Sequence, residues 1–283
     1  MTSRCPLRLL PLLLLLPLAA CSVAPVVADR EPDQYDADDV LLRDHPVPHV
    51  VVREAFVTAA TPEENIDSPA SWLQDGRRML VATAKATDAL VVYDGDTGRR
   101  LRTVGGPGTA PGRLQRPNGV ATIDDRYLFV VERDNRRVQM FQLPEFTPLL
   151  VFGAAELQQP YGLWVRASGD GYEVLVSDAY MAGEDANGDD IVPPLDQLDR
   201  RFRRYQVARD GDGWSARAAG AFGDSSAAGA IRVPESLFGD PAHDRLLVAE
   251  EDVPTGTRLR EYDLQGRYLG RDEIGRASCR ERV

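Results

Sequence analysis

Residues 105–143 read GGPGTAPGRLQRPNGVATIDDRYLFVVERDNRRVQMFQL and carry the clearest structural signal in this chain. A loop rich in Gly and Pro leads into a short apolar segment, 119–123. An Asp-Asp turn separates it from the fully apolar segment 127–131, and a charged turn precedes the alternating segment 138–143. Short segments of this kind, closely spaced and bounded by turn residues, are typical of an all-β sandwich, barrel or propeller.

The same block resembles one blade of the NHL-type β-propellers. Their pattern is PG-x-[FL]-x-x-P-x-GVA, then a short apolar strand, then N-x-R-[VI]-Q-x-F. Residues 111–121 and 135–141 match the two ends of this pattern. The resemblance implies that the block forms one blade of a propeller.

The pattern recurs along the chain, as expected for a repeat architecture. Four segments share an aromatic residue at one place, namely Tyr93, Phe141, Tyr205 and Tyr262. Each follows an apolar strand, at 79–82, 127–131, 172–176 and 245–249. We therefore predict an all-β fold with four blades, the third of which carries an insert at 182–200. A β-sandwich with similar strands is the alternative, and the absence of long helical patterns argues against an α/β fold.

Residues 1–21 resemble the signal peptide of a bacterial lipoprotein. Arg4 and Arg8 form a positive region before the apolar run 9–18, which is too short to span a membrane, so this segment is a targeting sequence. The Leu-Ala-Ala-Cys of 18–21 resembles a lipobox, which implies that Cys21 is lipidated after cleavage. An ordinary secretory peptide is the alternative. With Ser22 next in the chain, the resemblance implies a lipid-anchored protein of the cell envelope, on the outer membrane facing the periplasm or exposed.

The remaining organisation follows from composition. Residues 22–49 are acidic, contain prolines and are poor in aromatics, which indicates a flexible tether. Residues 50–272 form the predicted propeller. The tail 273–283, EIGRASCRERV, is encoded by DNA that resembles a common short-read sequencing adapter, so we expect it to be non-native. We expect a six-bladed parent of which about four blades are present, with exposed strand edges and poor solubility.

Charge and cysteine content exclude several classes of function. The chain has 44 acidic and 33 basic side chains and a net charge of −11, so a basic nucleic-acid footprint is absent. The acidity serves solubility, cation binding by carboxylates, or both. Cys5 is removed with the signal, Cys279 lies in the non-native tail and Cys21 is the expected lipidation site, so no disulfide framework is expected. The three His are scattered along the chain, which disfavours a His-based metal site. The chain has no G-x-S-x-G elbow, which disfavours a nucleophilic serine. We expect a monomer.

Several short motifs resemble the β-propeller phytases, whose opening pattern is DDPA-x-W, an apolar strand ending in a Lys-containing turn, and L-x-VY. The matching segments here are DSPASW at 67–72, LVATAK at 80–85 and LVVY at 90–93. Later matches are YGL at 161–163, PES at 234–236 and LVAEED at 247–252. The resemblance implies a 3-phytase-type phosphatase that hydrolyses calcium-bound phytate, with calcium as cofactor and a small anionic phosphate ester as substrate.

The resemblance to the β-propeller phytases also implies a role for individual residues of this chain. Asp67, Glu250, Glu251 and Asp252 would hold calcium, which prefers carboxylate oxygens. Glu235, Glu251 and Tyr161 would form the catalytic group around an activated water. Lys85, the only lysine among the 33 basic side chains, and Arg133 would hold phosphate. An ordinary loop lysine is the alternative for Lys85.

The chain departs from the phytase pattern at two places. Ser68 replaces the second Asp of DDPA, and Ala179-Tyr180 replaces a Lys-Glu pair, although Asp178 lies next to it. The acidic insert 184–190 partly matches a calcium loop, with a solvated surface loop as the alternative. Two other functions stay open: a non-catalytic NHL-like propeller that binds a protein or glycan, and a calcium-dependent sugar-lactone hydrolase.

Overall fold

A computed structural model describes residues 54–251 and 258–274 of the chain. All of them belong to one compact unit, Asp39–Val283. The predicted signal peptide with Cys21, the whole of the predicted tether, Asp252 and residues 275–283 of the tail lie outside the described residues. In the described part of the chain, no helix has the length and apolar character needed to cross a bilayer.

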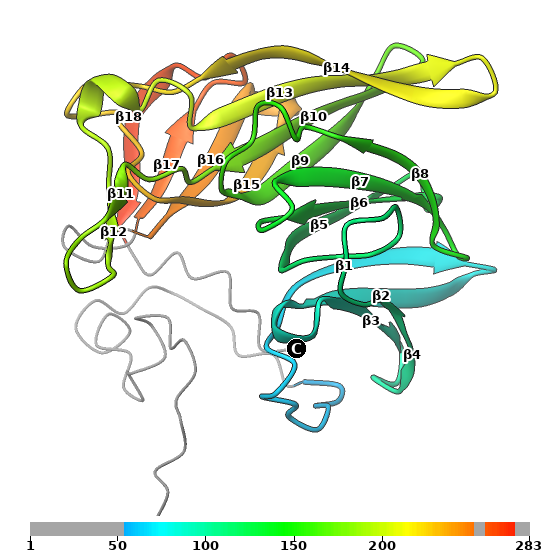
Figure 1. Cartoon of the computed structure of the whole chain (residues 1–283). Helices are drawn as coiled ribbons and strands as arrows, with labels where there is room; N and C mark the ends of the chain where they lie inside the picture. The colour runs from blue at the N-terminus through cyan, green and yellow to red at the C-terminus, as the bar shows by residue number, and fades with distance from the viewer. Residues whose placement is uncertain (1–53, 252–257, 275–283) are drawn as a thin grey trace, which may run out of the picture. The chain divides into compact units, whose positions relative to one another are not determined.

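The described residues form four antiparallel sheets of four strands each, which we call blades 1 to 4 (Figure 1). Blade 1 contains β1 (Ile66–Gln74), β2 (Arg77–Ala84), β3 (Ala89–Asp94) and β4 (Arg100–Gly105). Blade 2 contains β5 (Pro117–Ile123), β6 (Tyr127–Glu132), β7 (Arg137–Gln142) and β8 (Thr147–Phe152). Blade 3 contains β9 (Pro160–Ser168), β10 (Gly171–Asp178), β13 (Phe202–Asp210) and β14 (Gly213–Phe222). Blade 4 contains β15 (Pro234–Asp240), β16 (Arg245–Glu250), β17 (Arg258–Tyr262) and β18 (Tyr268–Ile274).

Strands in each blade pair in the order in which they occur along the chain. The predicted all-β propeller fold is confirmed, and the four repeats found by aligning aromatic residues correspond to the four blades. Three short 3-10 helices, η2 (Lys85–Thr87), η3 (Leu195–Gln197) and η4 (Pro241–His243), occur in connections.

The insert in the third blade is also present. It carries a small hairpin of β11 (Gly183–Glu184) and β12 (Asp190–Ile191) between β10 and β13. Asp185 Oδ1 accepts hydrogen bonds from the backbone nitrogens of Asn187 (2.7 Å) and Asp189 (3.0 Å). This carboxylate therefore closes a local turn, and these bonds hold its pKa below the usual range, with Asp189 contributing most.

The middle strands β3, β6 and β10 are buried on both faces, which explains why they read as largely apolar runs. In β6, Leu128 and Val130 pack in a core with blade 1, whereas Phe129 and Val131 pack in a core with blade 3. Successive side chains of a strand point to opposite faces, so one strand fills two cores. Fully burying each such side chain stabilises the fold by about 1.5–3 kcal/mol.

The first strand of each blade lies against the first strand of the next. β1 contacts β5, β5 contacts β9, and β9 contacts β15. We call these four first strands, β1, β5, β9 and β15, the inner strands. Because each inner strand begins at the same end of its blade, residues far apart in sequence are brought together at that end.

Candidate functional site

Every inner strand begins with the same irregularity. Pairing with the second strand of the blade breaks between Ile66 and Pro69, Pro117 and Val120, Pro160 and Leu163, and Pro234 and Leu237. Each break leaves two residues unpaired, which is the geometry of a β-bulge. The four bulges hold Asp67-Ser68, Asn118-Gly119, Tyr161-Gly162 and Glu235-Ser236. A polar or aromatic residue thus recurs at the first position and a small residue at the second.

Small second residues allow the inner strands to approach closely. A Cβ atom on Gly162 would lie 2.5 Å from the Glu235 carbonyl oxygen, and one on Gly119 would lie 2.8 Å from the Tyr161 carbonyl oxygen. The buried Ser177 hydroxyl joins two blades, because it accepts from Gly162 N (2.7 Å) and donates to the Glu235 carbonyl oxygen (2.6 Å). The bulges therefore fix the position of one blade against the next.

Three residues of the predicted site meet at this end of the blades. Lys85 Nζ lies 3.1 Å from Asp67 Oδ2 and 5.9 Å from the centroid of the Tyr161 ring. Lys85 is only 6% exposed, at the start of η2. Lys85 and Asp67 come from blade 1 and Tyr161 from blade 3, so the ammonium group reaches across the inner strand of blade 2.

That strand contributes Asn118, a residue to which the sequence analysis assigned no role. Its side chain is completely buried, and neither its amide nitrogen nor its amide oxygen has a hydrogen-bond partner. Burying an amide without a partner costs about 1–3 kcal/mol, and such groups are rare in native proteins. One sequence signal could have found it, since three inner strands open with the tripeptides PNG, PYG and PES.

A cavity of about 580 Å³ lies beside this group of residues. Its wall includes the small residue of each bulge, namely Ser68, Gly119, Gly162 and Ser236. Both its volume and its combination of apolar walls with adjacent polar groups are ordinary for a ligand site. Asn118 directly precedes Gly119 in the wall.

Positions equivalent to Lys85 lie at the same end of the other blades. Arg133, Ala179 and Glu251 each follow the second strand, and each backbone nitrogen donates to the loop before the inner strand, as that of Lys85 does (2.9–3.1 Å). Arg133 and Glu251 are half-buried there. Three of these four equivalent positions thus carry a charged residue, and the third blade carries Ala179 instead. Ala179 is also where the sequence departs from the phytase pattern.

The last residue of the second strand has a structural function in three blades. Glu132, Asp178 and Glu250 each accept a hydrogen bond from a backbone nitrogen just before the inner strand, at Gln115 (3.0 Å), Gln159 (2.7 Å) and Arg232 (2.7 Å). Glu250 also lies 3.5 Å from the Arg260 guanidinium. We call these three side chains the anchoring carboxylates. Burial raises the pKa of Asp178, and the hydrogen bonds from Gln159 and Gln158 oppose that shift.

Two of the predicted calcium ligands have other partners among the described residues. Within residues 54–251 and 258–274, no group of three or more Asp, Glu, His or Cys is placed to hold a metal ion. Asp67 pairs with Lys85, and Glu250 is an anchoring carboxylate. Asp252 lies outside the described residues, so the predicted calcium ligands Asp67, Glu250, Glu251 and Asp252 stay a prediction.

Comparisons with known proteins bear only on the fold of this chain. No family model matches the chain, and no curated protein matches it. Solved structures similar to it include Kuenenia stuttgartiensis hydrazine synthase, at 11% identity and a TM-score of 0.46 over 80% of this chain and 53% of that chain. The Swd1 β-propeller domain (Cps50) of Myceliophteria thermophila has 13% identity and a TM-score of 0.42, over 74% and 56%. A putative 6-phosphogluconolactonase from Bacteroides uniformis has 13% identity and a TM-score of 0.46, over 77% and 59%.

In each case this chain spans less than two thirds of the similar protein. At these identities and TM-scores, the comparisons do not bear on its function.

Proposed function

We propose that this chain is a binding β-propeller whose central cavity takes a small polyhydroxylated molecule, a sugar or an inositol. One observation carries the proposal: a ligand-sized cavity is bounded by the small bulge residues of all four inner strands, and the charged pair of Lys85 and Asp67 lies at the same end of the blades. A hydroxyl group both donates and accepts hydrogen bonds, so it can pair with an ammonium group and with a carboxylate. A polyol is therefore the class of molecule that suits this combination of groups.

Charge also favours a neutral ligand over a polyanion. The residues at this end of the blades carry three carboxylates, Asp67, Glu235 and Glu251, against the two cations Lys85 and Arg133. Asp67 already neutralises Lys85 at 3.1 Å. A highly phosphorylated molecule would meet a net negative site unless cations accompanied it, whereas hydroxyl groups can donate to the carboxylates.

A second candidate is the phosphatase implied by the sequence resemblance. It is favoured by the convergence of Lys85, Asp67 and Tyr161, which the phytase-like motifs had selected independently. In that case Lys85 and Arg133 would hold phosphate, and Glu235 and Glu251 would act beside them. We keep calcium, the phytate substrate and the lipid-anchored envelope location as parts of this proposal. No described feature favours the lactone-hydrolase alternative.

The first prediction concerns Asn118→Leu, which replaces the amide by an apolar side chain of similar size. It should raise the free energy of unfolding by about 1–3 kcal/mol, because the cost of the unpaired amide disappears. Binding of the polyol should be unchanged, because Asn118 is not part of the cavity wall. Urea unfolding measures the first effect, and calorimetric titration with myo-inositol and with glucose measures the second.

Asn187→Leu is the matched control, because Asn187 lies exposed in the insert hairpin, where neither quantity should change. A destabilised Asn118→Leu protein would contradict the cost assigned to the unpaired amide. Failure of the wild-type protein to bind either polyol would contradict the proposal. Release of phosphate from phytate, measured with and without calcium, separates the two candidate functions. Calcium-dependent release that disappears in Lys85→Ala would support the phosphatase instead.

A further inference from the structure

The central cavity has an apolar side, contributed by blade 4, that the proposed function leaves unused. Its wall there consists of Phe238 from β15, Leu247 and Ala249 from β16, and Leu259 from β17. Phe238 pairs with Leu247, and Ala249 pairs with Leu259. Directly opposed residues share one face of a sheet, as do alternate residues of one strand. The four side chains therefore form a continuous apolar surface on one face of blade 4.

This apolar surface is accessible to a bound molecule. Phe238 is 61% exposed, and Leu247 and Leu259 are half-buried. The residues that alternate with Leu247, namely Leu246 and Val248, pack in the core with blade 3 instead. An exposed aromatic ring in the wall of a cavity offers a large apolar area that a ligand can remove from water.

Another part of the same wall is small and polar. Ser68 and Ser236 each occupy the second position of a bulge, and each is half-buried. A hydroxyl group both donates and accepts hydrogen bonds, so either serine can pair with a hydroxyl group of a polyol. Ser236 precedes Phe238 by two residues, which corresponds to roughly 7 Å along an extended strand. A molecule that reaches from the serines to Phe238 therefore needs a polar part and an apolar part.

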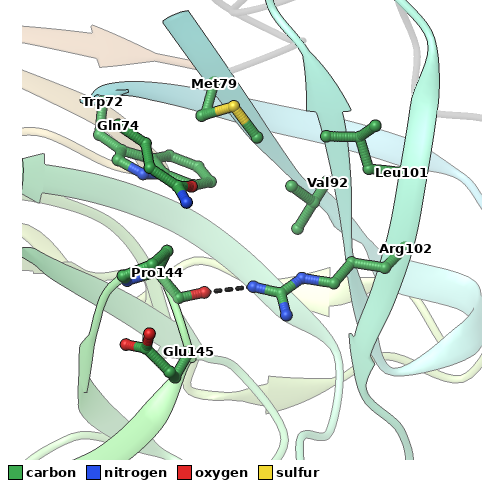
Figure 2. A pocket seen from close by; sticks show the side chains of 8 residues that line it. All are labelled: Trp72, Gln74, Met79, Val92, Leu101, Arg102, Pro144 and Glu145. Carbon is green, nitrogen blue, oxygen red and sulfur yellow. Dashed lines mark hydrogen bonds between the residues drawn. The ribbon is translucent and has the colours of Figure 1, made fainter. Parts of the chain in front are cut away.

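A smaller pocket among the described residues offers an internal comparison. It lies between blade 1 and the turn that joins β7 to β8, and Met79, Val92 and Leu101 form its apolar wall (Figure 2). Its volume is about 290 Å³, against about 580 Å³ for the central cavity. Val92 is buried, and Met79 and Leu101 are half-buried, so no apolar side chain there is as open as Phe238.

We propose that the central cavity binds a glycoside, in which a sugar ring carries an apolar substituent. This inference rests on the proposed function, because the sugar occupies the polar part of the cavity as the polyol does. The substituent packs against Phe238, Leu247 and Leu259. A cavity of about 580 Å³ lies within the range of ordinary ligand sites and is large enough for both parts of the molecule.

Calorimetric titration of the full chain with methyl, propyl and hexyl β-D-glucopyranoside tests the proposal, at a protein concentration where light scattering shows a monomer. We expect affinity to rise about threefold to fourfold for each methylene group that is removed from water. Equal affinity for the three glycosides would overturn the inference and leave the proposed function intact. Absence of binding by every glycoside and by glucose would contradict the proposed function itself.

Two further outcomes would also overturn the inference. If 1-hexanol binds as tightly as hexyl glucoside, the sugar contributes nothing to the binding. If affinity does not depend on chain length and Phe238→Ser only reduces self-association of the chain, a second copy occupies the apolar face instead of a ligand.

Three variants locate the substituent. Phe238→Ser should weaken binding of hexyl glucoside about tenfold and that of methyl glucoside less, because the buried apolar area is lost. Phe238→Leu keeps an apolar side chain and should retain most of the dependence on chain length. Leu101→Ser is the matched control, because it removes an apolar side chain from the pocket of Figure 2 and should not alter binding. Weaker binding of hexyl glucoside in Leu101→Ser but not in Phe238→Ser, with each variant folded by circular dichroism, would overturn the inference.

Discussion

Glu132 shows at the scale of a single residue what the NHL-like motif does physically. Its carboxylate is completely buried and accepts from Arg137 Nε (2.6 Å), Gln139 Nε2 (2.7 Å) and Asn135 Nδ2 (2.5 Å). These donors are the Asn, Arg and Gln of the N-x-R-V-Q motif. The motif is therefore a buried hydrogen-bond network around one carboxylate, which ties the second strand of blade 2 to the third.

Glu132→Ala should accordingly be among the most destabilising changes in blade 2. It leaves the buried Arg137 guanidinium without its carboxylate, and breaking one side of a buried pair costs about 3–5 kcal/mol. Urea unfolding followed by circular dichroism measures the loss. Glu184→Ala, at an exposed position of the insert hairpin, should change stability by less than about 0.5 kcal/mol. Similar values for the two variants would contradict the network.

At the scale of elements, the bulges at the start of β1, β5, β9 and β15 connect fold and site. Each places a polar or aromatic residue at the common end of the blades and a small residue beside it. Gly162 is the tightest of these positions, because the Glu235 carbonyl oxygen and Ser236 Cα would lie 2.5 Å and 2.9 Å from an added Cβ.

Gly162→Ala should therefore destabilise the protein by about 1–3 kcal/mol, since backbone on both sides must move apart. It should also weaken binding at the central cavity, whose wall includes Gly162. Thermal unfolding and calorimetry measure the two effects. Gly213→Ala is the control, because its nearest contact would be an ordinary 3.6 Å. A Gly162→Ala protein as stable as the control would show that β9 and β15 are not held this closely.

At the scale of the whole molecule, one sheet face among the described residues differs from the others. Leu237, Leu246 and Val248 of blade 4 pack in a core with blade 3. Residues that alternate with them, Phe238 and Leu247, point to the other face, which no described sheet covers. Phe238 is 61% exposed there. Uncovered apolar surface of this kind favours association.

The chain as given should thus self-associate with increasing concentration, and Phe238→Ser should reduce that association. Light scattering over a dilution series measures the effect. Val57→Ser removes an apolar side chain that is 74% exposed and lies outside the blades, and it should leave association unchanged. A strictly monomeric chain at all concentrations would contradict this prediction.

The amino-acid sequence by itself determined the four blades, their middle strands and the insert in blade 3. These features depend on local physics: the alternation of side chains along a strand, apolar runs buried on both faces, and turn residues between them. An aromatic residue at each repeat, from Tyr93 to Tyr262, was enough to align the blades.

Only the tertiary structure decided how the site is built. The meeting of Lys85, Asp67 and Tyr161 and the unpaired amide of Asn118 both depend on neighbouring blades. Bulge register and the close approach of inner strands set these contacts, and no local pattern encodes them. The anchoring of Glu250 has the same origin, because a carboxylate that reads as a metal ligand in sequence finds a backbone nitrogen in the fold.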